Sequence, residues 1–218
     1  MTDWATISSL ATAGGTLVLA AATFVAVRSA HRTASITERA MRASIRPLLV
    51  TSRFEDPTEK VGYADDHWVK VAGGRGVAEV GDDAIYLAIA LRNLGNGLAV
   101  LDRWDFSGDS ELNDFSPRRI VSEPPRNLDD FHRLTRDLYV PAGDLGFWQG
   151  VFRDPADPAF VAARDAITAR RILTIDLLYG DHEGGQRTIS RFALIPRDDG
   201  SWIASVSRHW NVDGEDPR

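Results

Sequence analysis

Two hydrophobic patterns divide the chain, and the first is a continuous apolar run near its beginning. No charged residue occurs from Ile7 to Val27, a stretch of 21 residues that as a helix would extend about 31 Å. The hydrocarbon core of a bilayer is about 30 Å thick, so the run is long enough to cross it. The predicted membrane span includes Ile7, Leu10, Leu17, Leu19, Phe24 and Val27.

Good helix formers follow this run without a breaker until Pro47, so the sequence predicts a single helix of about forty residues. A cleaved signal peptide would begin with positive charge, whereas the opening Met1–Trp4 carries only Asp3. We therefore expect the segment to be retained as a membrane anchor. A buried helix of a soluble fold is the alternative, because many small residues make the run only moderately hydrophobic.

Positive charge follows the span and is absent before it. Five arginines lie within about twenty residues after Val27, and this asymmetry predicts an outside N-terminus and a cytoplasmic C-terminal domain. These are Arg28, Arg32, Arg39, Arg42 and Arg46. Arg28 and Arg32 are nearest to the span, so we expect them to contact lipid headgroups.

The span also contains small residues at helical spacing, which allow two such helices to pack closely. They are Ser8, Ala11, Thr12, Gly15 and Thr16. A homodimer through this helix is one interpretation, and a lone lipid-facing helix is the other.

Beyond Pro47 the hydrophobic period changes from that of a helix to two. In Ile85–Asn93 the residues Ile85, Leu87, Ile89 and Leu91 alternate with smaller or polar side chains, which is typical of a strand with one buried face. The same alternation occurs in Leu48–Phe54, His67–Val71, Leu98–Phe106, Ile172–Tyr179, Arg187–Ile195 and Ser201–Trp210.

Turn-forming residues separate these runs at Asn96–Leu98, Gly180–Gly185 and Arg197–Gly200. Short alternating strands joined by such turns predict a mainly β protein, an antiparallel β-sandwich. We predict three parts: a transmembrane and juxtamembrane helix in residues 1–47, the sandwich in 48–212 and a polar tail in 213–218.

One helix is predicted to interrupt the second half of the domain. Asp157 can cap it, Pro158 suits its first position, and Phe160, Ala163 and Ile167 form an apolar stripe. We expect this helix to cross between the two sheets of the sandwich. The stretch of residues 123–137 has no clear period, and we predict a loop with at most one helical turn.

Two short motifs resemble those of bacterial immunoglobulin-like or fibronectin-like adhesion domains. Asn93, Gly95 and Ala99 match an N-x-G-x-x-x-A strand-turn-strand pattern, and Tyr139–Trp148 contains a Pro-x-Gly loop. Related patterns occur in single-span bacterial membrane proteins of unknown function. The resemblance implies an immunoglobulin-like sandwich that serves as an interaction or spacer module, with no catalytic residues to carry over.

Composition and charge narrow the function classes. The chain has no cysteine, which excludes disulfides, thiolate metal sites and a cysteine nucleophile. Its net charge is -6, and because residues 1–47 are basic, the acidity is concentrated in the rest of the chain. Nucleic acid is therefore not an expected partner of that part. Arginine outnumbers lysine 23 to 2, which is typical of a bacterial genome rich in G and C.

Candidate ligand-binding residues gather near one predicted turn. Asp181, His182 and Glu183 are adjacent, and His209 would join them if a late strand folded over this turn. Neighbouring side chains in a turn diverge, so we expect neither a metal site nor a cofactor. Trp210 is the remaining candidate contact for a ligand or partner, and sealing the end of the sandwich is its alternative role.

These observations favour a non-catalytic binding or scaffolding module at the inner face of a membrane, with the lipid bilayer and an unknown protein as partners. The alternative is a membrane-tethered hydrolase whose catalytic residues are dispersed along the chain. A histidine among His132, His182 and His209 within hydrogen-bond reach of a carboxylate would favour the hydrolase.

Overall fold

The computed structural model describes residues 4–107 and 127–214. The chain forms two compact units, Met1–Ser44 and Ile45–Arg218. Among the described residues, those of the first unit form a single helix, and the strands belong to the second unit.

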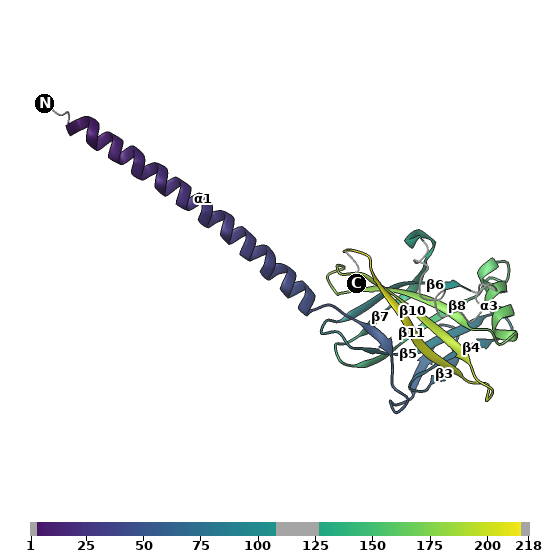
Figure 1. Ribbon diagram of the computed structural model, residues 1–218. Helices are drawn as coiled ribbons and strands as arrows, with labels where there is room; N and C mark the ends of the chain where they lie inside the picture. Colours follow the sequence, from purple (N-terminus) through teal and green to yellow (C-terminus); the bar gives the residue numbers. More distant parts are fainter. Residues whose placement is uncertain (1–3, 108–126, 215–218) are drawn as a thin grey trace. The chain divides into compact units, whose positions relative to one another are not determined.

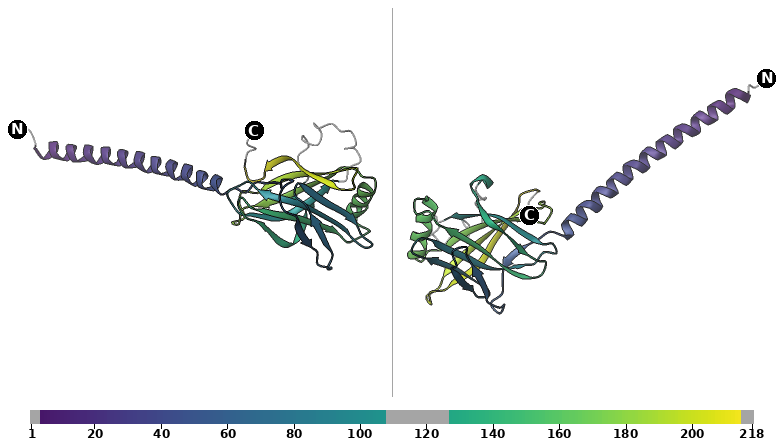
Figure 2. Two further views of the ribbon diagram at one scale, coloured as in Figure 1. Left: turned by 90° about the horizontal axis from the view of Figure 1, so that it is seen from below. Right: turned by 180° about the vertical axis from the view of Figure 1, so that it is seen from behind.

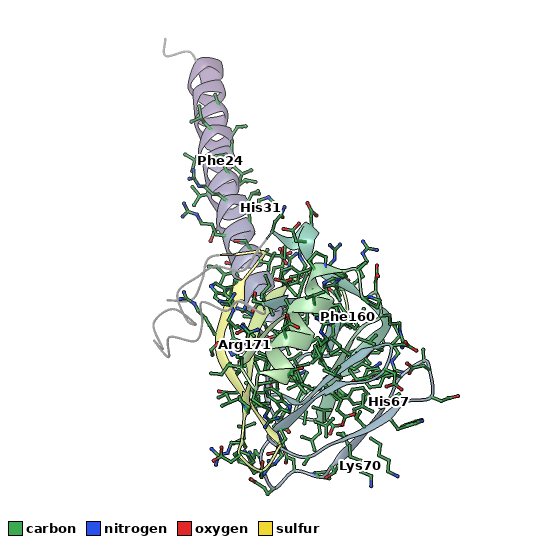
Figure 3. All side chains as sticks on the ribbon, turned by 90° about the vertical axis from the view of Figure 1, so that its right-hand side faces the viewer. Phe24, His31, His67, Lys70, Phe160 and Arg171 are labelled. Atoms are coloured by element: carbon green, nitrogen blue, oxygen red, sulfur yellow. The ribbon has the colours of Figure 1, made fainter. Side chains whose placement is uncertain are left out.

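Helix α1 runs from Trp4 to Ser44, 41 residues, as the sequence predicts. Over Ala13–Ser44, α1 is long and apolar enough to cross a membrane, and no other helix in the described part of the chain is. Leu17, Leu19, Phe24 and Val27 are all exposed along it, as Figure 3 shows for Phe24. The side chains of Ile7 and Leu10 lie outside the described part.

The second unit is mainly β, which confirms the predicted fold class. Its strands are β1 Leu49–Thr51, β2 Glu59–Gly62, β3 Trp68–Val71, β4 Arg75–Val80, β5 Ile85–Asn93, β6 Ala99–Ser107, β7 His132–Val140, β8 Leu145–Phe152, β9 Leu173–Gly180, β10 Thr188–Pro196 and β11 Trp202–Asn211. Every run predicted as a strand contains one, although the first is shorter than expected.

Nine of these strands form one antiparallel sheet, in the order β1-β5-β4-β11-β10-β9-β6-β7, with β8 paired to β5. The sheet curls so that its halves face each other in a sandwich-like arrangement (Figure 1), and Figure 2 shows the same curl from two further sides. The predicted turns Gly180–Gly185 and Arg197–Gly200 close the β9–β10 and β10–β11 hairpins. Asn96–Leu98 instead connects β5 to β6, which do not pair.

Large apolar side chains fill the space between the two halves, including the fully buried Trp148, Tyr179 and Phe192. Helix α3, Pro158–Thr168, adds Phe160 to this core. Its predicted cap is confirmed, because an Asp157 carboxylate oxygen accepts the backbone N–H of Ala159 at 2.8 Å. The helix leads from β8 to β9, which belong to the same curled sheet rather than to two separate ones.

The sequence predicted that Ile85–Asn93 would be a strand with one buried face. This prediction is wrong in part, because β5 is buried on both faces. The two-stranded ribbon β2–β3 lies over its second face, where Val61, Tyr63, Val69 and Val71 pack against Tyr86, Ala88 and Ala90. The alternation in His67–Val71 predicts a strand, but it does not show which surface that strand covers, so the second layer could not be predicted from the sequence.

The turn of the ribbon is fastened by Asp65. Its Oδ2 accepts from the Arg153 guanidinium at 2.7 Å and from the Tyr86 hydroxyl at 2.6 Å. The Arg153 guanidinium and the Tyr86 hydroxyl hold the pKa of the Asp65 carboxyl well below its usual range. The ribbon is therefore tied at its tip as well as by its apolar face.

Asn93 connects the first residues after α1 to the rest of the second unit. Its Oδ1 accepts the N–H groups of Leu48 at 3.1 Å and Gly95 at 2.9 Å. Its Nδ2 donates to the carbonyls of Gly97 at 2.7 Å and Val140 at 3.0 Å. The side chain has no exposed surface, so the Asn of the N-x-G-x-x-x-A motif joins three segments through its amide.

Two glycines of this turn are required by close backbone approach. A Cβ atom on Gly97 would lie 1.6 Å from the carbonyl oxygen of Ile45, and one on Gly95 would lie 2.2 Å from that of Arg46. No side chain fits at these distances. The residues of the motif therefore allow residues 45–48 to pack closely against this turn.

The prediction of a loop over residues 123–137 is wrong in its last part. A 3-10 turn, η2 Leu128–Asp130, precedes β7, and β7 begins at His132. Residues 123–126 lie outside the described part of the chain. This strand lies at an edge of the sheet and carries three charged residues in His132–Asp137 beside few apolar ones, so its sequence shows no clear strand pattern.

Candidate functional site

The two edges of the curled sheet come together at β7 and β8. The turn of residues 141–144 joins these strands, yet β7 pairs only with β6 and β8 only with β5. Residues 132–140 and 145–152 are not paired with each other as neighbouring strands of the sheet. We call the space between them the β7–β8 seam. Unpaired strand edges can accept a further extended segment.

A large bulge in β7 directs one arginine across the seam. The pairing of β6 with β7 passes from Leu101↔Leu138 to Arg103↔Arg133, so one residue of β6 faces four of β7. Arg136 lies within this bulge. Its Nη2 donates to Gln149 Oε1 on β8 at 2.7 Å and to the Gly62 carbonyl on β2 at 3.2 Å. At this bulge, the side-chain hydrogen bond from Arg136 to Gln149 therefore connects β7 and β8, which do not pair through their backbones.

A cleft of about 130 Å³ opens in the seam. It is lined by Trp104, His132, Arg133, Leu134, Arg136, Leu138, Gln149, Gly150 and Val151. A drug-sized ligand needs about 300 Å³ or more, so a space of this size suits one side chain or a small anion.

The inner wall of the cleft is aromatic. Trp104 lies 5.0 Å from the His132 ring, 5.2 Å from Trp148 and 5.0 Å from Phe152, measured between ring centroids. Gly150 completes this wall, because a Cβ atom there would lie 2.6 Å from the Trp148 ring. These contacts fix the base of the cleft, since the rings pack edge to face.

The mouth of the cleft carries positive charge. Arg133 and Arg136 are both exposed there, and neither has an ion pair with a carboxylate among the side chains that the structure describes, which do not include that of Asp137. Gln149 adds an amide beside them. Guanidinium groups present several N–H donors in a plane and match carboxylate geometry. The arrangement is suited to binding an anionic side chain.

The turn at Asp181 is built differently from a ligand site. Asp181 is buried, and its carboxylate accepts the N–H groups of Glu183 at 3.1 Å and Gly185 at 2.9 Å. His182 and Glu183 are exposed. The described residues contain no group of three His, Asp or Glu side chains that is arranged to hold a metal ion. Asp181 was a candidate ligand-binding residue of this turn. Its carboxylate instead stabilises the β9–β10 hairpin through backbone hydrogen bonds.

His209 lies in a polar chain on the core face of β9–β11. Its Nδ1 is 2.6 Å from Ser190 Oγ, which in turn is 2.8 Å from the Tyr179 hydroxyl oxygen. That oxygen accepts the N–H of Leu49 at 3.1 Å, and burial raises the pKa of the Tyr179 hydroxyl. Ser190 has no exposed surface, so the serine beside this histidine is closed to a substrate.

Trp210 lies on the opposite face of the sheet, over a row of charged residues. Asp105, Asp176, Arg191 and Arg208 are aligned across β6, β9, β10 and β11. Trp210 covers two of them, with its ring 4.9 Å from the Arg191 guanidinium carbon and 5.3 Å from that of Arg208. The tryptophan is thus already engaged by cation–π contacts.

The remaining histidines do not form an acid–base site in the described part of the chain. His132 contacts the rings of Trp104 and Phe152. His67 approaches a carboxylate, with its Nε2 3.3 Å from Glu79 Oε2. Both side chains are partly exposed on the sheet surface, and no nucleophile is hydrogen-bonded to either of them within the described residues.

Sequence reasoning missed the arginines and the glutamine of the seam. Arg133, Arg136 and Gln149 are scattered among other polar residues, and only the pairing of strands shows which edges stay open. One signal was available in Leu145–Phe152, because this stretch is rich in aromatic and branched apolar residues, which favour strands.

Comparison with known proteins gives no further assignment. No protein-family model matches the chain, and a search of the curated proteins finds no match. The site must therefore be interpreted from its own geometry.

Proposed function

We propose that the protein is a membrane-anchored, non-catalytic binding module that holds a carboxylate-bearing segment of a partner protein in the β7–β8 seam. The observation that carries this proposal is the arginine-lined cleft between two unpaired strand edges. An extended segment can align with an open edge through its backbone, while a pocket receives one of its side chains and gives specificity.

The charge at the mouth of the cleft supports an acidic side chain as the occupant. Arg133 supplies an exposed guanidinium that has no carboxylate partner among the side chains the structure describes, and Arg136 is held in place by Gln149. A carboxylate between them would form charge-assisted hydrogen bonds, the stronger class in proteins. The volume of about 130 Å³ matches a single Asp or Glu side chain.

A hydrolase is the second candidate, and the contact of 2.6 Å between Ser190 Oγ and His209 Nδ1 favours it. A serine nucleophile paired with a histidine base is the usual arrangement for acyl transfer. The complete burial of Ser190 and its second hydrogen bond to Tyr179 count against this role. We therefore rank the binding module first.

The binding of acidic peptides tests the proposal. A capped extended peptide with alternating valine and glutamate should bind the detergent-solubilised full chain, and its glutamine counterpart should bind far more weakly. Arg133→Gln should reduce affinity about tenfold or more, because it removes one charge-assisted contact and leaves the Arg136 bridge intact. Titration calorimetry measures both.

Arg164→Gln is the matched control, because Arg164 is an exposed arginine of α3 whose described partner is its neighbour Asp165. It should leave peptide affinity unchanged. Equal affinity for the two peptides, or equal weakening by the Arg133 and Arg164 variants, would contradict carboxylate recognition in the seam.

The membrane part of the proposal rests on α1 and on the arginines that follow its apolar half. We propose a single-pass protein with its N-terminus outside, its β unit in the cytoplasm and Arg28 and Arg32 at the headgroups. Exposure of the apolar side chains over residues 13–27 supports a lipid environment. A homodimer through this helix is compatible with the same arrangement.

Reporter fusions test this orientation. Alkaline phosphatase fused after Arg218 should be inactive, and a reporter that works only in the cytoplasm should be active at the same position, because positive residues are retained on the cytoplasmic side. Fusions placed before Met1 should give the reverse pattern. Active alkaline phosphatase at the C-terminus would reverse the proposed topology.

A further inference from the structure

The β2–β3 ribbon has an outer face that its packing on the sheet does not use. Val61, Val69 and Val71 point inward and are buried against β4, β5 and β8. Because successive residues of a strand point to opposite sides, Lys60 and Lys70 point outward. Figure 3 shows Lys70 at the periphery of the domain.

These residues are the two lysines of the chain, where every other basic side chain apart from histidine is arginine. They are directly opposite each other in the ribbon register. Like charges at paired positions disfavour strand pairing, and neither lysine forms an ion pair within the described ranges. The fold thus maintains two adjacent positive charges without compensating them.

Trp68 lies on the same face and completes a mixed surface. Its side chain is 67% exposed, and its ring rests on Gly62, where a Cβ atom would come within 2.9 Å of the ring. Lys60, Trp68, Val69 and Lys70 line a shallow hollow of about 470 Å³. We call Lys60, Trp68 and Lys70 the ribbon face.

We propose that the ribbon face docks on the headgroup region of an anionic lipid bilayer. Tryptophan prefers the membrane–water interface, because its ring is apolar and its indole N–H is polar. Lysine stems lie along apolar surface while their ammonium groups reach lipid phosphates. Each basic residue near an anionic surface is attracted to it even when the whole protein is acidic, as this one is.

Two features favour lipid over an acidic protein as the occupant. Lysine is a mobile point charge that suits a diffuse array of headgroups, whereas the geometric fork of arginine suits an individual carboxylate. The proposed anchor also keeps a bilayer close to the β unit at all times. The inference rests on this anchoring part of the proposed function, and not on the seam.

Tryptophan quenching in vesicles tests the ribbon face. The full chain is reconstituted in phosphatidylcholine vesicles with or without about one quarter phosphatidylglycerol, each with a headgroup-labelled nitroxide lipid. The difference between the full chain and its Trp68→Phe variant isolates the signal of Trp68. This signal should be quenched about twofold or more strongly in anionic vesicles, and about 0.5 M salt should remove the difference.

Lys60→Gln with Lys70→Gln should abolish the anionic enhancement, whereas Arg164→Gln with Arg197→Gln should retain it at the same net charge. Equal quenching of Trp68 in neutral and anionic vesicles would overturn the inference. So would a Trp68 response to polyglutamate but not to vesicles, since this would identify an acidic protein as the occupant.

Flotation of the same vesicles separates this inference from the anchor. If the protein floats with neutral vesicles but Trp68 shows no anionic enhancement, the anchor stands and the ribbon inference fails. If the protein does not float with neutral vesicles, the anchor fails. In that case the ribbon face is tested by the association of the chain with anionic vesicles. This association should be sensitive to salt, and the double lysine variant should lose it.

Discussion

Asn93→Ala is expected to lower the free energy of unfolding of the β unit by about 4 kcal/mol. The fully buried amide accepts the N–H groups of Leu48 and Gly95 and donates to the carbonyls of Gly97 and Val140. Alanine would leave these backbone groups without their partner in a place that water does not reach. Urea unfolding of the full chain in detergent, followed by tryptophan fluorescence, measures the loss.

Asn96→Ala is the matched control, because Asn96 belongs to the same turn and is exposed. It should change the unfolding free energy by less than about 0.5 kcal/mol. A similar small loss for Asn93→Ala would show that the segment after α1 is held without this amide, and it would remove the structural explanation of the motif.

Asp176→Ala is expected to cost a comparable amount, about 4 kcal/mol, for an electrostatic reason. Arg191 donates from Nε and Nη2 to the two carboxylate oxygens of Asp176 at 2.8 and 2.7 Å. Both side chains are buried, and Trp210 covers the guanidinium. Removing the Asp176 carboxylate leaves the buried Arg191 guanidinium without its bidentate partner. Unfolding in urea measures the resulting loss of unfolding free energy.

Two further variants separate this explanation from a general loss of packing. Asp213→Ala removes the carboxylate from the exposed Arg187–Asp213 pair and should cost less than about 1 kcal/mol. Asp176→Ala combined with Arg191→Met should recover much of the loss, because the guanidinium that the Asp176 carboxylate neutralises is removed together with it. If the double variant is less stable than Asp176→Ala alone, the buried charge is not the cause.

Asp213 also shows how segment boundaries depend on tertiary contacts. The sequence assigns it to a polar tail, yet its carboxylate accepts from the Arg187 backbone N–H at 2.8 Å and from the side-chain Nη2 at 2.6 Å. The Arg187 guanidinium holds the pKa of the Asp213 carboxyl below its usual range. An acidic residue at the start of the predicted tail is thus hydrogen-bonded into the β unit.

Local patterns predicted what depends on neighbouring residues. The apolar run and the absence of a breaker predicted α1, and Asp157 with Pro158 predicted the start of α3. The turns at Gly180–Gly185 and Arg197–Gly200 predicted two hairpins. In each case the hydrogen bonds form within a few residues, so their partners are present in the same short stretch of sequence.

The candidate site depends on contacts between distant residues, and only the tertiary structure decided it. Which strands end unpaired follows from the order of the whole sheet, and this order left β7 and β8 as neighbouring open edges. The bulge that brings Arg136 to Gln149 arises from a register shift between β6 and β7. The sequence by itself determined the long apolar helix α1, the β class and the local turns, because short-range periodicity specifies them. The seam and the second covered face of β5 required long-range pairing, which no local pattern specifies.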